Sequence, residues 1–157
     1  SRAFSDNSKL ETIPENLFKN NPEVEDFSLT FNNCEELETI PENLFKHNNK
    51  AKDFYSTFSY LKKLQTIPED LFKNNPEAQN FNSTFSYCEK LTNIPRYLFE
   101  NNNKSNNFLS TFSNCTSLRN LNLPNICHSL NESQYRAIFR GCINANNYSS
   151  IPESLKQ

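Results

Sequence analysis

The sequence predicts an α/β solenoid of 27-residue units, each with a short strand and two short helices. A nearly identical phrase, TIPENLFKNNPE, begins at Thr12 and returns as TIPENLFKHNNK at Thr39 and TIPEDLFKNNPE at Thr66. All fourteen phenylalanines fall into ladders of the same period. One unit holds too few apolar side chains to form a core of its own, so we expect stacked copies to share one continuous core.

The apolar positions of the unit form regular columns. The three phenylalanine ladders are Phe4, Phe31, Phe58, Phe85, Phe112, Phe139; Phe18, Phe45, Phe72, Phe99; and Phe27, Phe54, Phe81, Phe108, continued by Tyr135. The aliphatic columns are Leu10, Leu37, Leu64, Leu91, Leu118; Ile13, Ile40, Ile67, Ile94, Leu121; and Leu17, Leu44, Leu71, Leu98. We expect these columns to be buried.

The strand of each unit is expected just before the Ile-Pro pair. In CEELETIP this places it around Leu37 to Ile40, and Pro41 ends it because proline cannot continue a ladder.

Two short helices are expected after the strand. PENLFK suits a first helix, because proline fits the first helical position and Glu69 lies four residues before Lys73, the favoured order for an ion pair. In NPEAQNFNSTFSYC, Asn75 as cap and Pro76 as first residue predict a second helix with Phe81 and Cys88 on one face.

Asparagine is expected to replace glycine at the turns. The chain has one glycine, Gly141, and asparagine is among the few other residues that tolerate a positive φ. We therefore predict such turns at 20–21, 48–49, 74–75 and 101–103. A bias of codon usage towards AT-rich codons is the alternative explanation for the many asparagines.

The chain is expected to be a single repeat domain, 1–157, of about five to six units. The repeat becomes irregular towards the end of the chain. Leu121 and Asn122 replace Ile-Pro, and the pair Ile151-Pro152 lies later than the 27-residue period predicts. Terminal repeats are typically irregular, so 122–157 is predicted to be a degenerate C-terminal cap. Because the chain starts inside a repeat and has no methionine, we expect it to be part of a longer protein.

Several function classes are disfavoured by composition. The net charge of −2 offers no basic excess for nucleic acid, and no apolar run reaches the ~18 residues of a membrane span. We expect no cofactor and no metal, because the chain has no glycine-rich phosphate loop and no paired Cys-x-x-Cys ligands.

The cysteines are expected to be buried core residues rather than ligands. Cys34, Cys88, Cys115 and Cys142 occupy one column, whose remaining member is Leu61. Leucine replaces a small buried hydrophobe but not a disulfide partner or metal ligand. No disulfide is therefore expected, although a bridge between Cys115 and Cys142 stays open as an alternative, since stacked units bring the two within reach.

No catalytic residue is predicted, and the chain is not expected to be an enzyme. Cys127 lies outside the cysteine column and precedes His128, but adjacent residues rarely form a productive dyad. The carboxylates recur once per unit, which is typical of capping and solubility.

The segment TFSYCEKLTNIP resembles the BspA-type leucine-rich repeat of bacterial and protist surface proteins. TFSNCTSLRNLNL is similar to the related repeats of mycoplasma-type lipoproteins. The resemblance covers essentially the whole chain, although the family's units are somewhat shorter. It implies a leucine-rich-repeat-like solenoid, exposed at the cell surface or secreted, that captures a ligand or mediates adhesion, and it implies no catalytic residue.

The predicted binding residues are the variable pair before each Ile-Pro, which would line the concave face of such a solenoid. They are Glu11, Thr12, Glu38, Thr39, Gln65, Thr66, Thr92, Asn93, Arg119 and Asn120. They change from acidic to neutral to basic along the array. The alternative is that these positions are only solvated and that any ligand binds elsewhere.

We expect a non-enzymatic module of a bacterial or phage protein that binds a protein or a carbohydrate. Two alternatives remain: a rigid spacer or scaffold, and a domain that selects the substrate for a larger toxin or effector.

Overall fold

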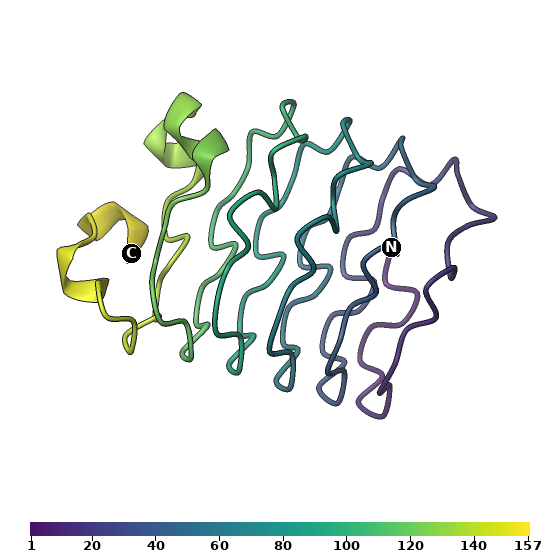
Figure 1. Cartoon of the computed structure of the whole chain (residues 1–157), viewed down its shortest axis with the longest axis horizontal. Helices are drawn as coiled ribbons and strands as arrows, with labels where there is room; N and C mark the ends of the chain where they lie inside the picture. The colour runs from purple at the N-terminus through teal and green to yellow at the C-terminus, as the bar shows by residue number, and fades with distance from the viewer.

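The computed structural model describes all 157 residues as a row of stacked coils (Figure 1). The coils lie side by side from the N-terminal to the C-terminal end, and each repeats the 27-residue unit. The chain forms no α-helix and no β-strand. Its only helices are four short 3-10 helices near the C-terminal end: η1 (Asn125–Ser129), η2 (Glu132–Gln134), η3 (Tyr148–Ser150) and η4 (Glu153–Leu155). The prediction of an α/β unit with one strand and two helices is therefore wrong.

The predicted strand is missing because its column carries too few hydrogen bonds between coils. The backbone amide of Thr92 donates to the carbonyl of Gln65, and that of Arg119 donates to the carbonyl of Thr92, each at 3.2 Å. A parallel ladder needs bonds on both sides of the paired residue, and this column has at most one bond between neighbouring coils and none among the first three. Isolated parallel bridges form in a different column, at Asp26, Asp53, Asn80 and Asn107.

The first predicted helix is replaced by tight turns. In PENLFK the amide of Leu44 donates to the carbonyl of Pro41 at 3.2 Å, which is a three-residue step rather than a four-residue one. Six residues are too few for a helix without tertiary support, since about 12 to 15 are needed even for marginal stability. The expected pair of Glu69 and Lys73 does not form, and Lys73 pairs with Asp70 at 2.9 Å instead.

The second predicted helix is interrupted by two residues in the left-handed region. Ser83 has a φ of 56° and Tyr87 a φ of 60°, and a left-handed residue cannot continue a right-handed helix. Amides of this segment bond to the next coil instead: Phe81 donates to the carbonyl of Asn107 at 2.8 Å and Phe85 to that of Thr111 at 2.9 Å. Bonds between coils thus replace the bonds of a helix.

The same two left-handed positions recur in every coil. They are Arg2, Leu29, Ser56, Ser83, Ser110, Ala137, and Asp6, Asn33, Tyr60, Tyr87, Asn114, Gly141. None of the asparagine turns predicted at 20–21, 48–49, 74–75 and 101–103 has a positive φ, so that prediction is wrong. The chain places serine and tyrosine where glycine would be strain-free, which costs conformational energy at each position.

The asparagines of the predicted turns have a different role, because one asparagine is fully buried in each of three of the four turns. The side-chain amide of Asn102 donates to the carbonyl of Phe72 at 3.0 Å and to that of Asn75 at 2.8 Å. Asn75 and Asn48 repeat the arrangement with their own preceding coils. The asparagine ladder, defined as Asn48, Asn75 and Asn102, gives each of these carbonyls a second donor beside the backbone amide that it already accepts.

Thr84 and Thr111 form a threonine ladder whose hydroxyls likewise bond to backbone carbonyls elsewhere in the coil. Buried Thr84 donates its hydroxyl to the carbonyl of Phe81 at 2.8 Å or of Phe54, one coil earlier, at 2.9 Å. Thr111 is placed alike in the next coil.

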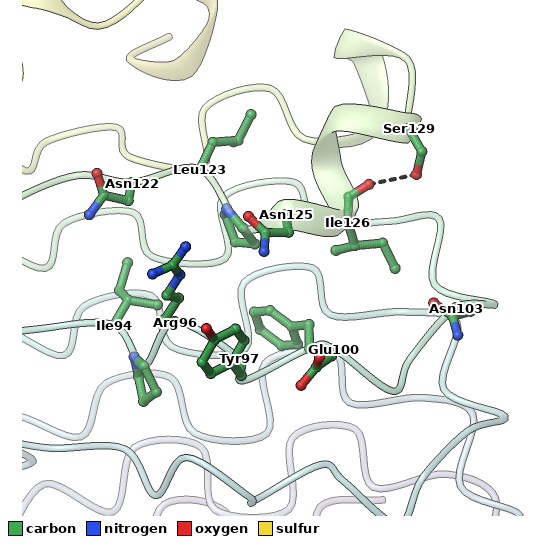
Figure 2. Close-up of a pocket in the computed structure, with 13 residues that line it drawn as sticks. Ile94, Arg96, Tyr97, Glu100, Asn103, Asn122, Leu123, Asn125, Ile126 and Ser129 are labelled. Carbon is green, nitrogen blue, oxygen red and sulfur yellow. Dashed lines mark hydrogen bonds between the residues drawn. The ribbon is translucent and has the colours of Figure 1, made fainter.

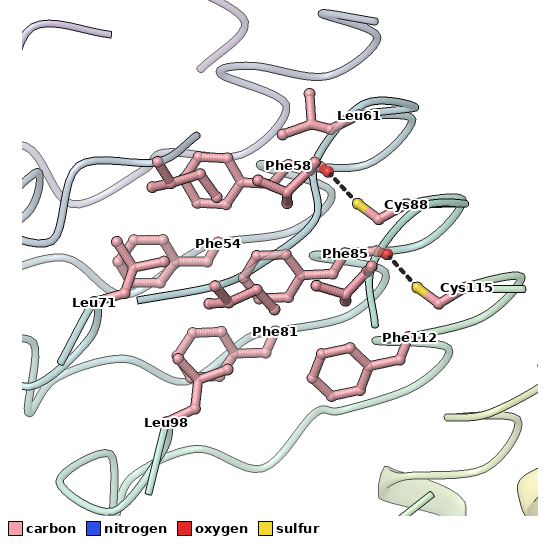
Figure 3. Close-up of a cluster of buried hydrophobic side chains, with 14 of the residues drawn as sticks. Phe54, Phe58, Leu61, Leu71, Phe81, Phe85, Cys88, Leu98, Phe112 and Cys115 are labelled. Atoms are coloured by element: carbon pink, nitrogen blue, oxygen red, sulfur yellow. Dashed lines mark hydrogen bonds between the residues drawn. The ribbon is translucent and has the colours of Figure 1, made fainter. Parts of the chain in front are cut away.

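The core consists of the predicted phenylalanine ladders (Figure 3). The rings of Phe58 and Phe85 stack with centroids 5.6 Å apart and planes 10° apart, and Phe112 follows Phe85 at 5.7 Å. Phe54 and Phe81, of a second ladder, stack at 5.4 Å. All five rings are fully buried, so the prediction that these columns form one continuous core is confirmed. No helix has the length and apolar character that crossing a membrane requires.

Candidate functional site

The ten predicted binding residues lie on the outside of the coils, and we call them the variable row. Nine are exposed and Thr92 is half-buried. The aliphatic residues on either side, such as Leu37 and Ile40, are buried. The bonds that join Gln65, Thr92 and Arg119 hold successive members of the row next to each other.

The N-terminal end of the variable row borders a small depression of about 320 Å³. It is lined by Glu11, Thr12, Glu36, Glu38, Thr39 and Lys63. The ammonium of Lys63 binds the carboxylate of Glu36 at 2.6 Å. This hydrogen bond, with smaller contributions from Glu38 and Glu11, raises the pKa of Lys63 above its ordinary value. Three carboxylates and one ammonium make this end of the row acidic.

Sequence reasoning missed Glu36 and Lys63. It considered only the pair before each Ile-Pro, whereas these two residues lie just before the leucine column. Their opposite charges, 27 residues apart, were the available signal. The same pattern joins Glu23 to Lys50, and Glu77 to Lys104, with nitrogen–oxygen distances of 2.5 and 2.6 Å.

The C-terminal end of the row is basic. Arg119 is exposed, and its carbonyl accepts the amide of Asn146 from the following coil at 2.8 Å. The row therefore changes from carboxylates at Glu11 and Glu38 to a guanidinium at Arg119.

A larger cleft of about 640 Å³ lies where the repeat breaks, between residues 94–103 and 122–129 (Figure 2). Its apolar wall includes Ile94, Phe99, Leu123 and Ile126. Its polar wall includes Arg96, Tyr97, Glu100, Asn103, Asn122 and Asn125. We call this hollow the repeat-break cleft, and no pattern in the sequence predicted it.

The cleft exists because the phenylalanine ladder ends. Phe72 and Phe99 stack at 5.8 Å, but the residue 27 positions after Phe99 is Ile126. There η1 replaces the tight turn of the earlier coils. A smaller side chain on a different backbone leaves the space open.

The cysteines are buried, as predicted, and their thiols are free. Cys88 donates to the carbonyl of Phe58 at 3.2 Å and Cys115 to that of Phe85 at 3.1 Å, each in the preceding coil (Figure 3). Cys142 does the same with Phe112 at 3.1 Å.

Cys127 is placed unlike a nucleophile. It is buried, and burial raises the pKa of its thiol to about 12, so the thiol stays protonated at neutral pH. His128 beside it is exposed. No group of three or more His, Cys, Asp or Glu side chains is arranged to hold a metal ion.

Comparisons with known proteins find a weak likeness. No protein-family model and no curated protein sequence matches the chain. The chain is similar to a leucine-rich repeat protein of known crystal structure from Bacteroides ovatus, with 21% identity over 78% of this chain and a TM-score of 0.34. It spans 33% of the length of that protein.

Proposed function

We propose that this chain is a non-enzymatic recognition module that binds a protein or a glycan along the variable row. The observation that supports this is the contrast between inside and outside. Successive coils keep the same buried phenylalanine, leucine and isoleucine columns, while the exposed pair between those columns changes in charge and size from coil to coil.

A row of this kind suits an extended partner. Each coil presents one pair of side chains at a nearly regular interval, because the coils are joined by backbone bonds and stacked rings. The acidic end at Glu38 and the basic end at Arg119 favour a partner of opposite polarity, which fixes its direction along the row. Within this proposal the module acts at a bacterial or phage surface, or in secreted form.

The proposal is tested by exchanging the charges at the two ends. The double variant Glu38→Lys/Arg119→Glu reverses the polarity without changing the net charge. We expect binding on a glycan array or a peptide array to weaken about tenfold or more, since rim charges steer docking and suppress wrong orientations.

The matched control is Glu42→Lys/Lys46→Glu. Both residues are exposed and outside the row, and the exchange is again neutral. The control should bind as the parent chain does. Binding by Glu38→Lys/Arg119→Glu equal to that of the parent would remove the row from the proposal.

The continuous core supports a second function, that of a stiff spacer. Here the bonds and ring stacks between coils would serve only to hold other domains apart. A spacer binds nothing on either array and keeps its role when a whole unit is added or removed. The arrays therefore separate the two functions.

A further inference from the structure

We propose that the repeat-break cleft is a separate binding site for a neutral sugar residue. It does not include the variable row, and it does not depend on the function proposed for that row.

The first support is that the fourth copy of the repeated motif departs from the others at the cleft. Glu15, Glu42 and Glu69 occupy the position of Arg96; Asn16, Asn43 and Asp70 occupy that of Tyr97; Lys19, Lys46 and Lys73 occupy that of Glu100. PENLFK has become PRYLFE. All three changed side chains line the cleft, and Figure 2 shows them on the side that faces Asn122 to Ile126.

An exchange of charge between Arg96 and Glu100 could also relieve columns of like charge. Glu100 lies near enough to Lys73 to contribute to its raised pKa, after the larger effect of the hydrogen bond to Asp70. This explanation does not account for Tyr97. Tyr97 is 45% exposed, so its side chain is not a core residue. The guanidinium of Arg96 lies 5.4 Å from the centre of its ring.

The second support is the chemistry of the lining. The charges of Arg96 and Glu100 cancel, so the cleft has no net preference for an anion or a cation. Asn103, Asn122 and Asn125 add amides, each with a paired donor and acceptor. Neighbouring hydroxyls of a sugar ring are also donors and acceptors side by side, and planar amide, guanidinium and carboxylate groups match them.

The apolar part of the cleft completes the match. The exposed ring of Tyr97 and the side chains of Ile94 and Ile126 offer apolar surface to the C–H face of a pyranose. The volume of about 640 Å³ falls within the ~300–1,000 Å³ typical of small-ligand sites. A neutral ring with one apolar face and a polyhydroxylated edge is therefore the ligand class that this lining fits.

The test uses the whole chain, labelled with ¹⁵N, and methyl glycosides of glucose, galactose, mannose and N-acetylglucosamine. We expect at least one glycoside to shift the backbone amides of residues 94–103 and 122–129 in a saturable titration. Amides of the first two coils should stay unchanged. If none of the four glycosides shifts the amides of the cleft, the proposal is overturned.

Three variants address the cleft directly. Tyr97→Ala removes an exposed ring, and Ile126→Phe extends the phenylalanine ladder into the cleft. Arg96→Glu/Glu100→Lys restores the charges of the other copies. We expect each to weaken glycoside binding about tenfold or more, while Tyr97→Ala leaves the thermal midpoint unchanged.

The controls separate binding from stability. Glu69→Arg/Lys73→Glu makes the same charge exchange in the third copy, outside the cleft, and should bind as the parent does. Glu38→Lys/Arg119→Glu should also bind the glycoside normally, whatever it does to the variable row. Unchanged affinity in Tyr97→Ala would overturn the assignment even if Ile126→Phe failed to fold.

Discussion

The side-chain amide of Asn75 donates to the backbone carbonyl of Asn48, 27 residues earlier, at 2.8 Å. The same nitrogen donates to Phe45 at 3.1 Å. Both ends of this contact are buried, so one short polar side chain ties two coils together inside the core. A residue that the local sequence marks as a turn former is in fact a link between repeats.

Replacing Asn75 with alanine should destabilise the fold by about 1–3 kcal/mol, because it removes two buried hydrogen bonds worth about 0.5–1.5 kcal/mol each. The carbonyls of Phe45 and Asn48 keep the backbone amides of Asn48 and Ala51 as donors. Urea unfolding followed by circular dichroism measures the loss. The adjacent, exposed Asn74→Ala is the control and should change the free energy of unfolding by less than about 0.5 kcal/mol. Equal effects at both positions would contradict the ladder.

Ser110→Gly should stabilise the chain slightly, and Ser110→Val should destabilise it. Ser110 has a φ of 54°, a region that glycine enters without strain and a β-branched residue enters at a cost of about 1 kcal/mol or more. We expect a gain of up to about 1 kcal/mol for glycine. Thermal unfolding of the two variants gives the comparison, and a valine variant as stable as the parent would show that this position is not strained.

The free energy of unfolding should fall between about pH 9 and pH 12. Burial raises the pKa of the Cys142 thiol from 9.0 to about 12, and the folded state thus favours the protonated thiol. This contribution is complete below pH 9 and is lost as the pH rises through the folded value, by about 1.4 kcal/mol per pH unit. Urea unfolding at pH 8 and pH 10 tests it.

The control is Cys142→Leu, because Leu61 shows that the column accepts leucine. This variant should lose less stability between pH 8 and pH 10 than the parent chain. An equal loss in the two proteins would mean that other groups, such as the tyrosines, account for the change.

Deleting residues 55–81 should leave a folded, shorter stack. The deletion joins Phe54 to Asn82, which is the junction that Phe81 and Asn82 already form in the parent. Since each coil contacts only its neighbours, the stability of a repeat array is close to a sum over units and interfaces. Urea unfolding should remain cooperative, with a lower midpoint and a smaller dependence on urea. An unfolded product would contradict the view that the coils contribute to stability independently.

The far-ultraviolet circular dichroism spectrum should lack the double minimum of α-helix. The only helices are 3-10 turns of three to five residues, and the other residues form turns and irregular backbone. A strong helical signal would contradict this structure and support the two-helix unit instead.

The sequence was sufficient to predict the buried columns. Phe58, Phe85 and Phe112 recur at one interval, and only stacked units can bury a side chain at that period. The same reasoning placed the pair before each Ile-Pro outside, since Leu37 and Ile40 beside it had to be inside.

The conformation within the unit could not be predicted, because local patterns compete with bonds between coils. Asn75-Pro76 and the spacing of Phe81 and Cys88 favour a helix when only near neighbours are considered. Each amide donates one strong bond, however, and that of Phe81 is taken by Asn107 in the next coil. The carbonyl that wins lies 26 residues away, beyond any local pattern.

The two candidate sites differ in the same way: the variable row could be predicted from the sequence, and the repeat-break cleft could not. Glu38 and Arg119 belong to a column and are visible in the sequence as variation within a fixed frame. The repeat-break cleft arises only where Tyr97 meets Asn122 to Ile126 across two coils, so its lining is a product of packing. The period and the inside–outside pattern were determined by the sequence itself, since the hydrophobic driving force is non-directional and follows the apolar area of the side chains. The turns, the buried asparagines and the cleft were decided by tertiary structure, since each depends on which backbone groups of another coil lie within bonding distance.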